Sequence, residues 1–234
     1  MKLNQGISII IPTYNEAGTI NVLLEQILEL EDDKKIQVIV VDAKNSNDNL
    51  STAISSFPVE VISSQHTSRA KQMNEGAKHA KYDILYFVHA DALPPKGFYQ
   101  DINNSLSKGN EFGYFSYQFD SSNIFLKINT YFSKFNGFYT GGGDQTFFIN
   151  KSLFDTMNGF DSNLQLCEDF DMHRRLKKAN RKFEIIHNPV IISDRKYQKS
   201  NYFWINMVNF YILTRFKLGH NPDVLKKAYV RLIK

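Results

Sequence analysis

Apolar runs of strand length alternate with amphipathic segments through the first hundred residues of the chain. The runs predict buried strands at 7–12, 36–42, 59–63 and 84–88. Apolar residues spaced three and four apart predict helices over 19–30 and 68–80. Strands that alternate with helices are typical of a parallel sheet covered on both faces. We therefore predict an α/β fold with a doubly wound, mostly parallel sheet.

The pattern becomes less regular after residue 97. An aromatic stretch, FGYFSYQF, occupies 112–119 and is followed by a predicted helix over 124–135. A glycine run at 141–143 precedes a predicted strand over 145–149, and another helix is expected from about Lys151. No internal repeat, low-complexity linker or clear second core interrupts the 234 residues.

Composition narrows the class of protein. The chain is 42% hydrophobic and 22% charged, which is ordinary for a globular protein and excludes a disordered or collagenous one. Its single cysteine, Cys167, excludes an internal disulfide and a multi-cysteine zinc site. A single cysteine is most natural in a reducing compartment, so we expect a cytoplasmic protein. The apolar stretch at 7–11 is too short for a signal sequence and is better interpreted as the first strand.

Charge is distributed unevenly along the chain. Residues 195–234 contain nine Lys or Arg and one acid, Asp223, for a net charge of +8. Residues 1–194 contain 19 basic and 23 acidic residues, for a net charge of −4. The C-terminal segment is therefore a basic appendage on an acidic body.

The basic tail also contains many aromatic and aliphatic residues. Its most apolar part, 202–213, is about twelve residues long and includes Asn206 and Asn209, whereas a membrane span needs about 20 apolar residues. A helix that lies on an anionic membrane surface fits this composition. A helix that folds over an acceptor cleft, or one that forms a dimer contact, fits about as well. No nucleic-acid partner is expected.

Polar segments follow three of the predicted strands: PTYNE at 12–16, DAKNSND at 42–48 and HAD at 89–91. In open α/β sheets, ligands bind beyond the carboxyl ends of the strands, so these segments are the candidate binding residues. The glycine-rich motifs that bind dinucleotides or nucleoside triphosphates are absent from the sequence. A dehydrogenase or a P-loop enzyme is therefore not expected.

His89 and Asp91 directly follow the strand predicted at 84–88. Side chains two residues apart in an extended segment point the same way, roughly 6 to 7 Å apart, so the pair could face one cation. The alternative is a histidine that only caps the strand end. His187 could supply another ligand, although a lone histidine on a strand is more often structural.

Five segments together carry a resemblance to family 2 glycosyltransferases of the GT-A fold. They are SIIIPTYNEAGTI, VVDAKNSNDN, SRAKQMNEGAKHA, LYFVHADALPP and NGFDSNLQLCEDFDMHRRLKKAN, in the order of the family, over residues 7–195. The chain resembles a bacterial subgroup that has His-Ala-Asp where most relatives have Asp-x-Asp. The resemblance implies a Rossmann-like GT-A domain at 1–195 and a helical tail at 196–234.

The resemblance also implies a reaction. Members transfer a sugar from a nucleotide-diphosphate donor, here a UDP- or GDP-sugar, to the hydroxyl of a glycan or lipid acceptor, with inversion, in glycan, glycolipid or cell-envelope synthesis. Asp91 matches the acid that binds a divalent cation, Mn²⁺ or Mg²⁺, and carboxylate oxygens suit such cations. His89 could instead contact the ribose or the diphosphate. Asp169 matches the general base of the family.

By the same resemblance, Pro12, Thr13, Tyr14 and Glu16 line the nucleotide pocket, and Asp42 hydrogen-bonds the base. Considered by itself, an acid after a strand is more often a loop cap. The segment after Asp42 departs from the common family pattern and is one residue longer, with Ser46 and Asp48 as its plausible matches.

The remaining candidates come from the later motifs, and each has a plain structural alternative. Arg69 would reach the diphosphate, or it could be a solvated side chain at a helix start. Gly143 and Asp144 would lie against the donor sugar, or they could form an ordinary turn. Glu168 and Asp169 could simply stabilise the dipole of the helix that they begin. Ala90 is included as the middle residue of the His-Ala-Asp segment.

Two other functions remain open. His89 and the altered segment after Asp42 are compatible with a non-catalytic protein that binds sugar nucleotides. A sugar-1-phosphate nucleotidyltransferase shares the strand order, but the segment PTYNEAGT lacks the glycine-rich loop with Arg and Lys expected after its first strand.

Overall fold

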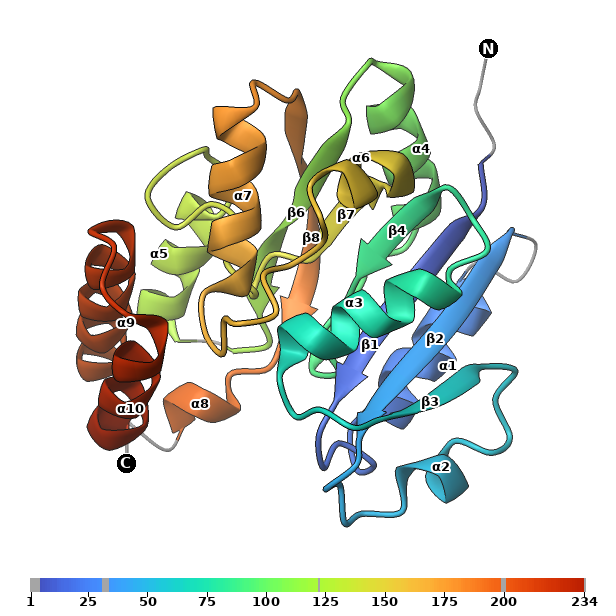
Figure 1. Cartoon of the computed structure of the whole chain (residues 1–234), viewed down its shortest axis with the longest axis horizontal. Helices are drawn as coiled ribbons and strands as arrows, with labels where there is room; N and C mark the ends of the chain where they lie inside the picture. The colour runs from blue at the N-terminus through green and yellow to red at the C-terminus, as the bar shows by residue number, and fades with distance from the viewer. Residues whose placement is uncertain (1–4, 31–33, 122, 199–200, 234) are drawn as a thin grey trace.

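The computed structural model describes residues 5–30, 34–121, 123–198 and 201–233, and it shows one mixed sheet with helices on both faces (Figure 1). The strands are β1 Ile7–Thr13, β2 Ile36–Ala43, β3 Glu60–Ser64, β4 Ile84–Phe87, β5 Ala92–Leu93, β6 Phe112–Phe119, β7 Phe147–Asn150 and β8 Phe183–Ile192. The helices are α1 Ile20–Leu30, α2 Leu50–Ala53, α3 Arg69–His79, α4 Phe98–Ser107, α5 Ile124–Phe132, α6 Lys151–Thr156, α7 Glu168–Lys178, α8 Arg195–Gln198, α9 Tyr202–Lys217 and α10 Pro222–Ile233.

The eight described strands lie in the order β3-β2-β1-β4-β7-β6-β8-β5. β1 pairs in parallel with β2 over its whole length, from Ile7 opposite Ile36 to Thr13 opposite Asp42, and β1 also pairs in parallel with β4. β7 is antiparallel to both of its neighbours, and β5 is antiparallel to β8. The prediction of a mostly parallel sheet is confirmed.

Helices cover both faces of the sheet because β1 is apolar on both sides. Ile9 packs in the cluster that contains α1, whereas the next residue, Ile10, packs in the cluster that contains α3. A Cβ atom on Gly76 would lie 2.6 Å from Ile10 Cγ2. Only a glycine there lets α3 approach the sheet this closely.

The later half of the sheet is where the structure adds most to the sequence pattern. The aromatic stretch at 112–119 is the long strand β6, and β8 pairs with it in parallel. Most of β6 is buried on both faces, so it lacks the alternation that marks a half-exposed strand. β7 begins two residues later than predicted, and α5 ends three residues earlier than predicted.

The C-terminal helices α9 and α10 pack on the segment that leads into α7. Val208 and Leu213 of α9 share a buried cluster with Leu164 and Cys167, and the indole Nε1 of Trp204 donates to Leu232 O at 2.7 Å. The division into a domain at 1–195 and a tail at 196–234 stays a prediction. Helix α7, before residue 195, and helices α9 and α10, after it, contribute residues to this one cluster. Among the described residues, no helix combines the length and the apolar character needed to cross a membrane.

Candidate active site

The predicted site residues gather at the edge of the sheet where its parallel strands end. The arrowheads of β1, β4 and β8 point to this edge in Figure 1. Because β7 runs the opposite way, its amino end lies at the same edge, directly after residues 141–146. The antiparallel strand therefore brings the glycine run to the residues that follow β4.

Two helices begin beside each other at this edge. Arg69 is the first residue of α3 and Glu168 is the first residue of α7, and Arg69 Nε lies 2.8 Å from Glu168 Oε1. The Glu168 side chain is only 1% exposed, and its Oε2 atom has no hydrogen-bond partner within the described part of the chain. Leaving a buried carboxylate oxygen without a donor is costly. A hydroxyl donor that reached this oxygen would relieve that cost.

Asp169 is the second residue of α7 and is also buried. Burial raises the pKa of its carboxyl group, the charges of Glu168 and Asp144 raise that pKa further, and Arg69 opposes the rise. A carboxylate with a raised pKa binds a proton more strongly than an ordinary aspartate does. Asp169 is therefore suited to act as a general base.

Gly143 lies among the side chains of three different elements. A Cβ atom on Gly143 would be 3.0 Å from Asp169 Oδ2, 3.1 Å from His89 Nε2 and 3.8 Å from Arg69 Nη1. The predicted residues Arg69, His89, Gly143 and Asp169 therefore meet in one place. The small space above Gly143 is bounded by a carboxylate, an imidazole and a guanidinium.

Gly143→Ala is expected to reduce activity without unfolding the protein. The added methyl group would push Asp169 or His89 aside by a few tenths of an ångström. Because small displacements of reacting groups are costly, we expect activity to fall by about tenfold or more. Gly137→Ala in the same loop is the matched control, since the only atom near its added Cβ is 4.0 Å away. Equal activity of the two variants would contradict this account of Gly143.

His89 is half-buried and uncharged at neutral pH. Burial lowers the pKa of its imidazole to about 3, with a further contribution from the positive charge of Arg69. A neutral imidazole can accept a hydrogen bond or bind a cation through Nε2. His89 Nε2 faces the space above Gly143, so a ligand-contacting role stays a prediction beside the capping role.

Asp91 has different neighbours from His89. Arg195, the first residue of α8, places Nη2 at 3.9 Å from Asp91 Oδ2 and at 3.7 Å from Glu16 Oε2. The carboxylates of Glu16 and Asp91 therefore face one positive charge. Around this point, the described residues form no group of three His, Cys, Asp or Glu side chains that could hold a metal ion.

The loops after β1 and β2 are fixed to each other. Thr13 Oγ1 donates to Asp42 Oδ1 at 3.0 Å, and burial raises the pKa of Asp42 while the Thr13 hydrogen bond partly opposes this. Ser46 accepts from the Asn15 N–H, and Asp48 accepts from the Ala17 N–H at 2.7 Å. The altered segment after Asp42 is thus an ordered wall of the site. Tyr14 projects from this wall with its side chain exposed.

Three predicted residues lie at the margin of this arrangement. Pro12 is buried within β1, and Ala90 packs in the hydrophobic core on the α1 side of the sheet. His187 is exposed on β8 and makes a hydrogen bond through Nε2 with Lys134 O at 3.1 Å.

Asp144 is exposed beside Gly143, close enough to influence the pKa values of Arg69 and Asp169.

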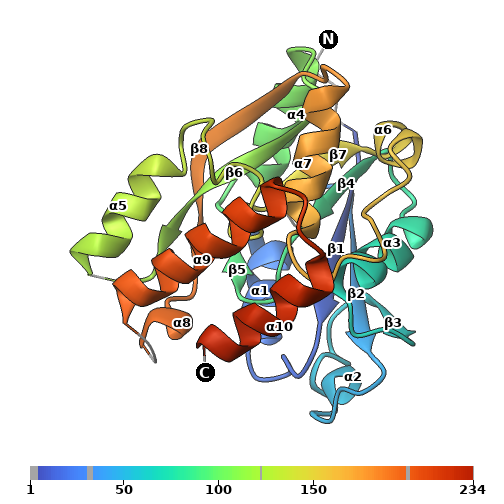
Figure 2. The same ribbon diagram turned by 60° about the vertical axis from the view of Figure 1, so that its left-hand side comes forward.

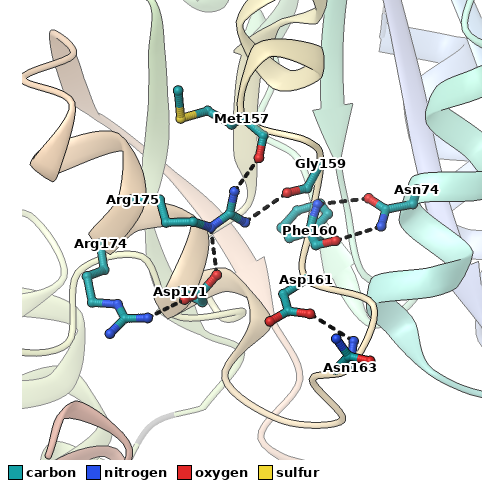
Figure 3. Close-up of polar contacts among 9 residues, drawn as sticks. All are labelled: Asn74, Met157, Gly159, Phe160, Asp161, Asn163, Asp171, Arg174 and Arg175. Carbon is teal, nitrogen blue, oxygen red and sulfur yellow. Dashed lines mark hydrogen bonds and ion pairs between the residues drawn. The ribbon is translucent and has the colours of Figure 1, made fainter. Parts of the chain in front are cut away.

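Figure 3 shows how the loop before α7 is held in place. Arg175 on α7 donates to Met157 O at 2.6 Å and to Gly159 O at 2.8 Å, and it pairs with Asp171 at 2.7 Å. Asn74 on α3 makes reciprocal hydrogen bonds with the Phe160 backbone at 2.8 and 2.9 Å. These contacts fix the segment that sets the start of α7, and with it the position of Asp169.

Arg175→Met is expected to lower the free energy of unfolding by about 2–4 kcal/mol, because it leaves two carbonyl groups and part of a buried carboxylate unpaired. Arg174→Met is the matched control. Arg174 also pairs with Asp171 but is 62% exposed, so we expect its loss to cost about 0–1 kcal/mol. Chemical denaturation of both variants measures the difference. Equal losses of unfolding free energy in the two variants would show that the hydrogen bonds from Arg175 to the two carbonyl groups do not stabilise the fold.

Arg195 is the residue of this site that the sequence analysis did not identify. The only signal was a basic residue directly after an apolar strand, in the segment IISDRK. Its position became informative only once β8 proved to be parallel to β6, because this orientation sends its carboxyl end to the same edge as Asp91.

A comparison with family models matches residues 8–163, about two thirds of the chain, to glycosyl transferase family 2. Among curated proteins, the poly-beta-1,6-N-acetyl-D-glucosamine synthase of Staphylococcus aureus (strain MSSA476) is 30% identical over 94 residues. This alignment covers 38% of the chain and 22% of the synthase. The chain therefore spans about a fifth of the length of the curated relatives that it matches.

Solved structures show the same fold. The mannosyltransferase PcManGT from Pyrobaculum calidifontis, in complex with GDP-Man and Mn²⁺, superposes with a TM-score of 0.71 at 15% identity, covering 97% of this chain and 68% of that one. S. aureus TarS 1-349 in complex with UDP-GlcNAc superposes with a TM-score of 0.65 at 18% identity, covering 97% and 70%. The predicted GT-A fold is confirmed.

Proposed function

Because the chain belongs to glycosyl transferase family 2 and is a glycosyltransferase, we propose that it moves a sugar from a nucleotide-diphosphate donor to an acceptor hydroxyl with inversion. The observation that carries this proposal is the meeting of Asp169, His89 and Arg69 above Gly143, with Glu168 paired to Arg69. A general base, an unpartnered carboxylate oxygen and a cation lie where a donor sugar could approach the backbone.

In the proposed reaction, Asp169 takes the proton of the acceptor hydroxyl. The acceptor oxygen forms a bond to the anomeric carbon as the bond from that carbon to the diphosphate breaks, and the electron pair leaves with the diphosphate. Glu168 would hold a hydroxyl of the sugar through its unpartnered oxygen. Arg69 would hold Glu168 in place and add positive charge near the leaving group.

The nucleotide would bind against the loops that follow β1 and β2. Thr13 and Asp42 are joined by a hydrogen bond, so Asp42 is held in position to contact the base. Tyr14 is exposed beside them and can stack on a base or ribose. Pro12 supports this wall from within the sheet, and Glu16 lies at its end beside Arg195.

A divalent cation, Mn²⁺ or Mg²⁺, would be held by Asp91. The Asp91 carboxylate is about half-exposed and its oxygens are ligands that such cations accept, so the residue fits this role. Because the described residues form no group of three ligating side chains, water and donor oxygens would supply the remaining ligands. When bound, the cation neutralises negative charge on the diphosphate. His89, neutral and close to Gly143, would contact the diphosphate or ribose.

We expect the acceptor to be a glycan or a lipid and the reaction to serve glycan, glycolipid or cell-envelope synthesis. A cytoplasmic location, at the inner face of a membrane, stays a prediction. The curated relative is named as a synthase of an N-acetylglucosamine polymer, and one solved neighbour is in complex with UDP-GlcNAc, which supports a glycan as the product class.

Thermal-shift measurements with UDP-, GDP- and dTDP-sugars in the presence of Mn²⁺ would test donor binding. A ligand at about 100 times its Kd stabilises the folded state by about 2.7 kcal/mol. We expect one nucleotide class to raise the unfolding temperature and the other two to do so much less. No shift with any of the three donors would contradict the proposed donor site.

A further inference from the structure

The structure has a wide exposed apolar surface on α5 and α9. We define the α5–α9 face by six side chains, each at least 47% exposed: Ile124, Ile128, Phe132, Phe203, Met207 and Phe210. Their spacing of three or four residues puts three on one stripe of α5 and three on one stripe of α9. Isolated exposed apolar residues are common, but a continuous patch of this kind marks an interaction site.

The two helices form one surface. The Phe125 ring on α5 lies 5.4 Å from the Tyr202 ring and 5.0 Å from the Phe203 ring on α9. Farther along, the Phe138 ring lies 5.4 Å from the Phe210 ring. Figures 1 and 2 both show α5 and α9 on the same side of the molecule. A partner that touches one helix would therefore also meet the other.

Charge and composition identify the kind of partner. Residues 121–143 and 195–221 contain seven Lys or Arg and no Asp or Glu. The same two segments hold thirteen of the 32 aromatic residues of the chain, although they make up only about a fifth of it. Aromatic side chains favour the boundary between lipid headgroups and acyl chains, and basic side chains favour anionic headgroups.

A second copy of the chain fits this surface poorly. A two-fold dimer would place the same patch against itself, so exposed basic side chains such as Lys127 would face basic side chains of the other copy, with acids only beyond the ends of the two segments. An anionic lipid surface supplies the missing negative charge. We propose that the α5–α9 face docks on the headgroup region of an anionic membrane.

Docking would also place the site near the lipid surface. The loop that carries Phe135, Phe138 and Tyr139 has these side chains exposed, and it leads directly into Gly141 and the turn beside Asp169. On a bilayer docked through this face, the loop that ends at Gly143 would lie close to the headgroups. The docking itself does not depend on the proposed transfer reaction and can be measured without a substrate.

Co-sedimentation of the full chain with lipid vesicles tests the proposal. We expect binding to vesicles of equimolar phosphatidylglycerol and phosphatidylcholine, weaker binding as salt rises, and little binding to phosphatidylcholine alone. Equal binding to both vesicle types, or no binding to either, would overturn the proposal.

Two variants separate the apolar contribution from the charge contribution. Phe132→Ser combined with Met207→Ser should weaken vesicle binding by about tenfold or more, because both side chains are exposed and would enter the lipid. Val22→Ser on α1, where Val22 is equally exposed, is the matched control and should bind as the wild type does. Lys127→Glu should weaken binding by about fivefold or more, whereas Lys35→Glu should not.

Folding and self-association must be measured for the same variants. Unchanged unfolding temperatures would show that lost binding is not lost structure, and these side chains are exposed enough for that to be expected. Sedimentation velocity of the wild type should give a monomer. A wild-type dimer that the Phe132→Ser and Met207→Ser changes convert to a monomer, without vesicle binding in either protein, would assign the face to self-association and overturn the proposal.

Discussion

Asp169→Asn is expected to reduce sugar transfer by about 10²- to 10⁴-fold, the loss typical when a general base is removed. The amide keeps the size of the side chain but cannot take the acceptor proton. Donor affinity should persist, because Asp169 is proposed to meet the acceptor and not the nucleotide. Initial rates at saturating acceptor, together with donor binding by thermal shift, measure the two effects separately.

Glu168→Gln is the comparison for this variant. Glu168 precedes Asp169 in sequence and is also buried, but it pairs with Arg69, so its proposed role is to hold ligand hydroxyls. We expect a smaller loss of transfer than in Asp169→Asn. Wild-type transfer by Asp169→Asn would place the base elsewhere, with Glu168 and Asp144 as the next candidates.

Asp169→Asn should also stabilise the fold. The pKa of Asp169 is raised in the folded protein above its ordinary value near 3.8, so folding favours the protonated form. Stability from this group is therefore present below pH 3.8 and is lost as pH rises through the folded-state pKa. At neutral pH wild-type Asp169 must bind a proton or bury a charge beside Glu168 when the chain folds, whereas the Asn variant does neither, so the variant should unfold at a higher temperature. A lower unfolding temperature would contradict the raised pKa of Asp169.

Asp91→Asn is expected to lower turnover by about 10²-fold or more and to weaken metal-dependent donor binding. The reason is that an amide oxygen is a much poorer ligand for Mn²⁺ or Mg²⁺ than a carboxylate is, and a bound cation supplies several kcal/mol of charge stabilisation. Titration of the metal at fixed donor, followed by initial rates, measures both quantities. His89→Ala should cost less and could shift the preference between the two metals.

Arg195→Gln distinguishes a metal-binding role of Asp91 from a role in holding Arg195. If Asp91 acted only by holding Arg195, removing the guanidinium should reproduce the loss seen in Asp91→Asn without changing the metal dependence. We expect a smaller loss in Arg195→Gln and a metal requirement like that of the wild type. Full activity of Asp91→Asn would remove Asp91 from the metal site.

The first half of the fold could be read directly from the sequence. β1, β2 and β4 are apolar runs flanked by amphipathic helices, and their hydrophobic periodicity follows from local burial on two faces of one sheet. The ends of these strands were located to within one residue for the same reason. The segments at 12–16, 42–48 and 89–91 therefore appear where the sequence analysis placed them.

The later half could not be read in this way. β6 is aromatic along its length because it is buried on both faces, so its sequence carries no alternation to mark it. Its pairing with β8 joins residues more than sixty positions apart, and no local pattern specifies such a partner. The parallel direction of β8 is what delivers Arg195 to Asp91.

Residue type and motif order thus predicted which side chains would carry the chemistry, since a base, a cation ligand and a nucleotide wall each need particular functional groups. Only the tertiary structure decided their neighbours. It placed Gly143 against Asp169 and His89 through the antiparallel direction of β7, it gave Asp91 a different neighbour, Arg195, and it turned α5 and α9 into one apolar surface. The physical reason is that hydrophobic periodicity reports burial within one element, whereas contacts between elements depend on strand order and direction.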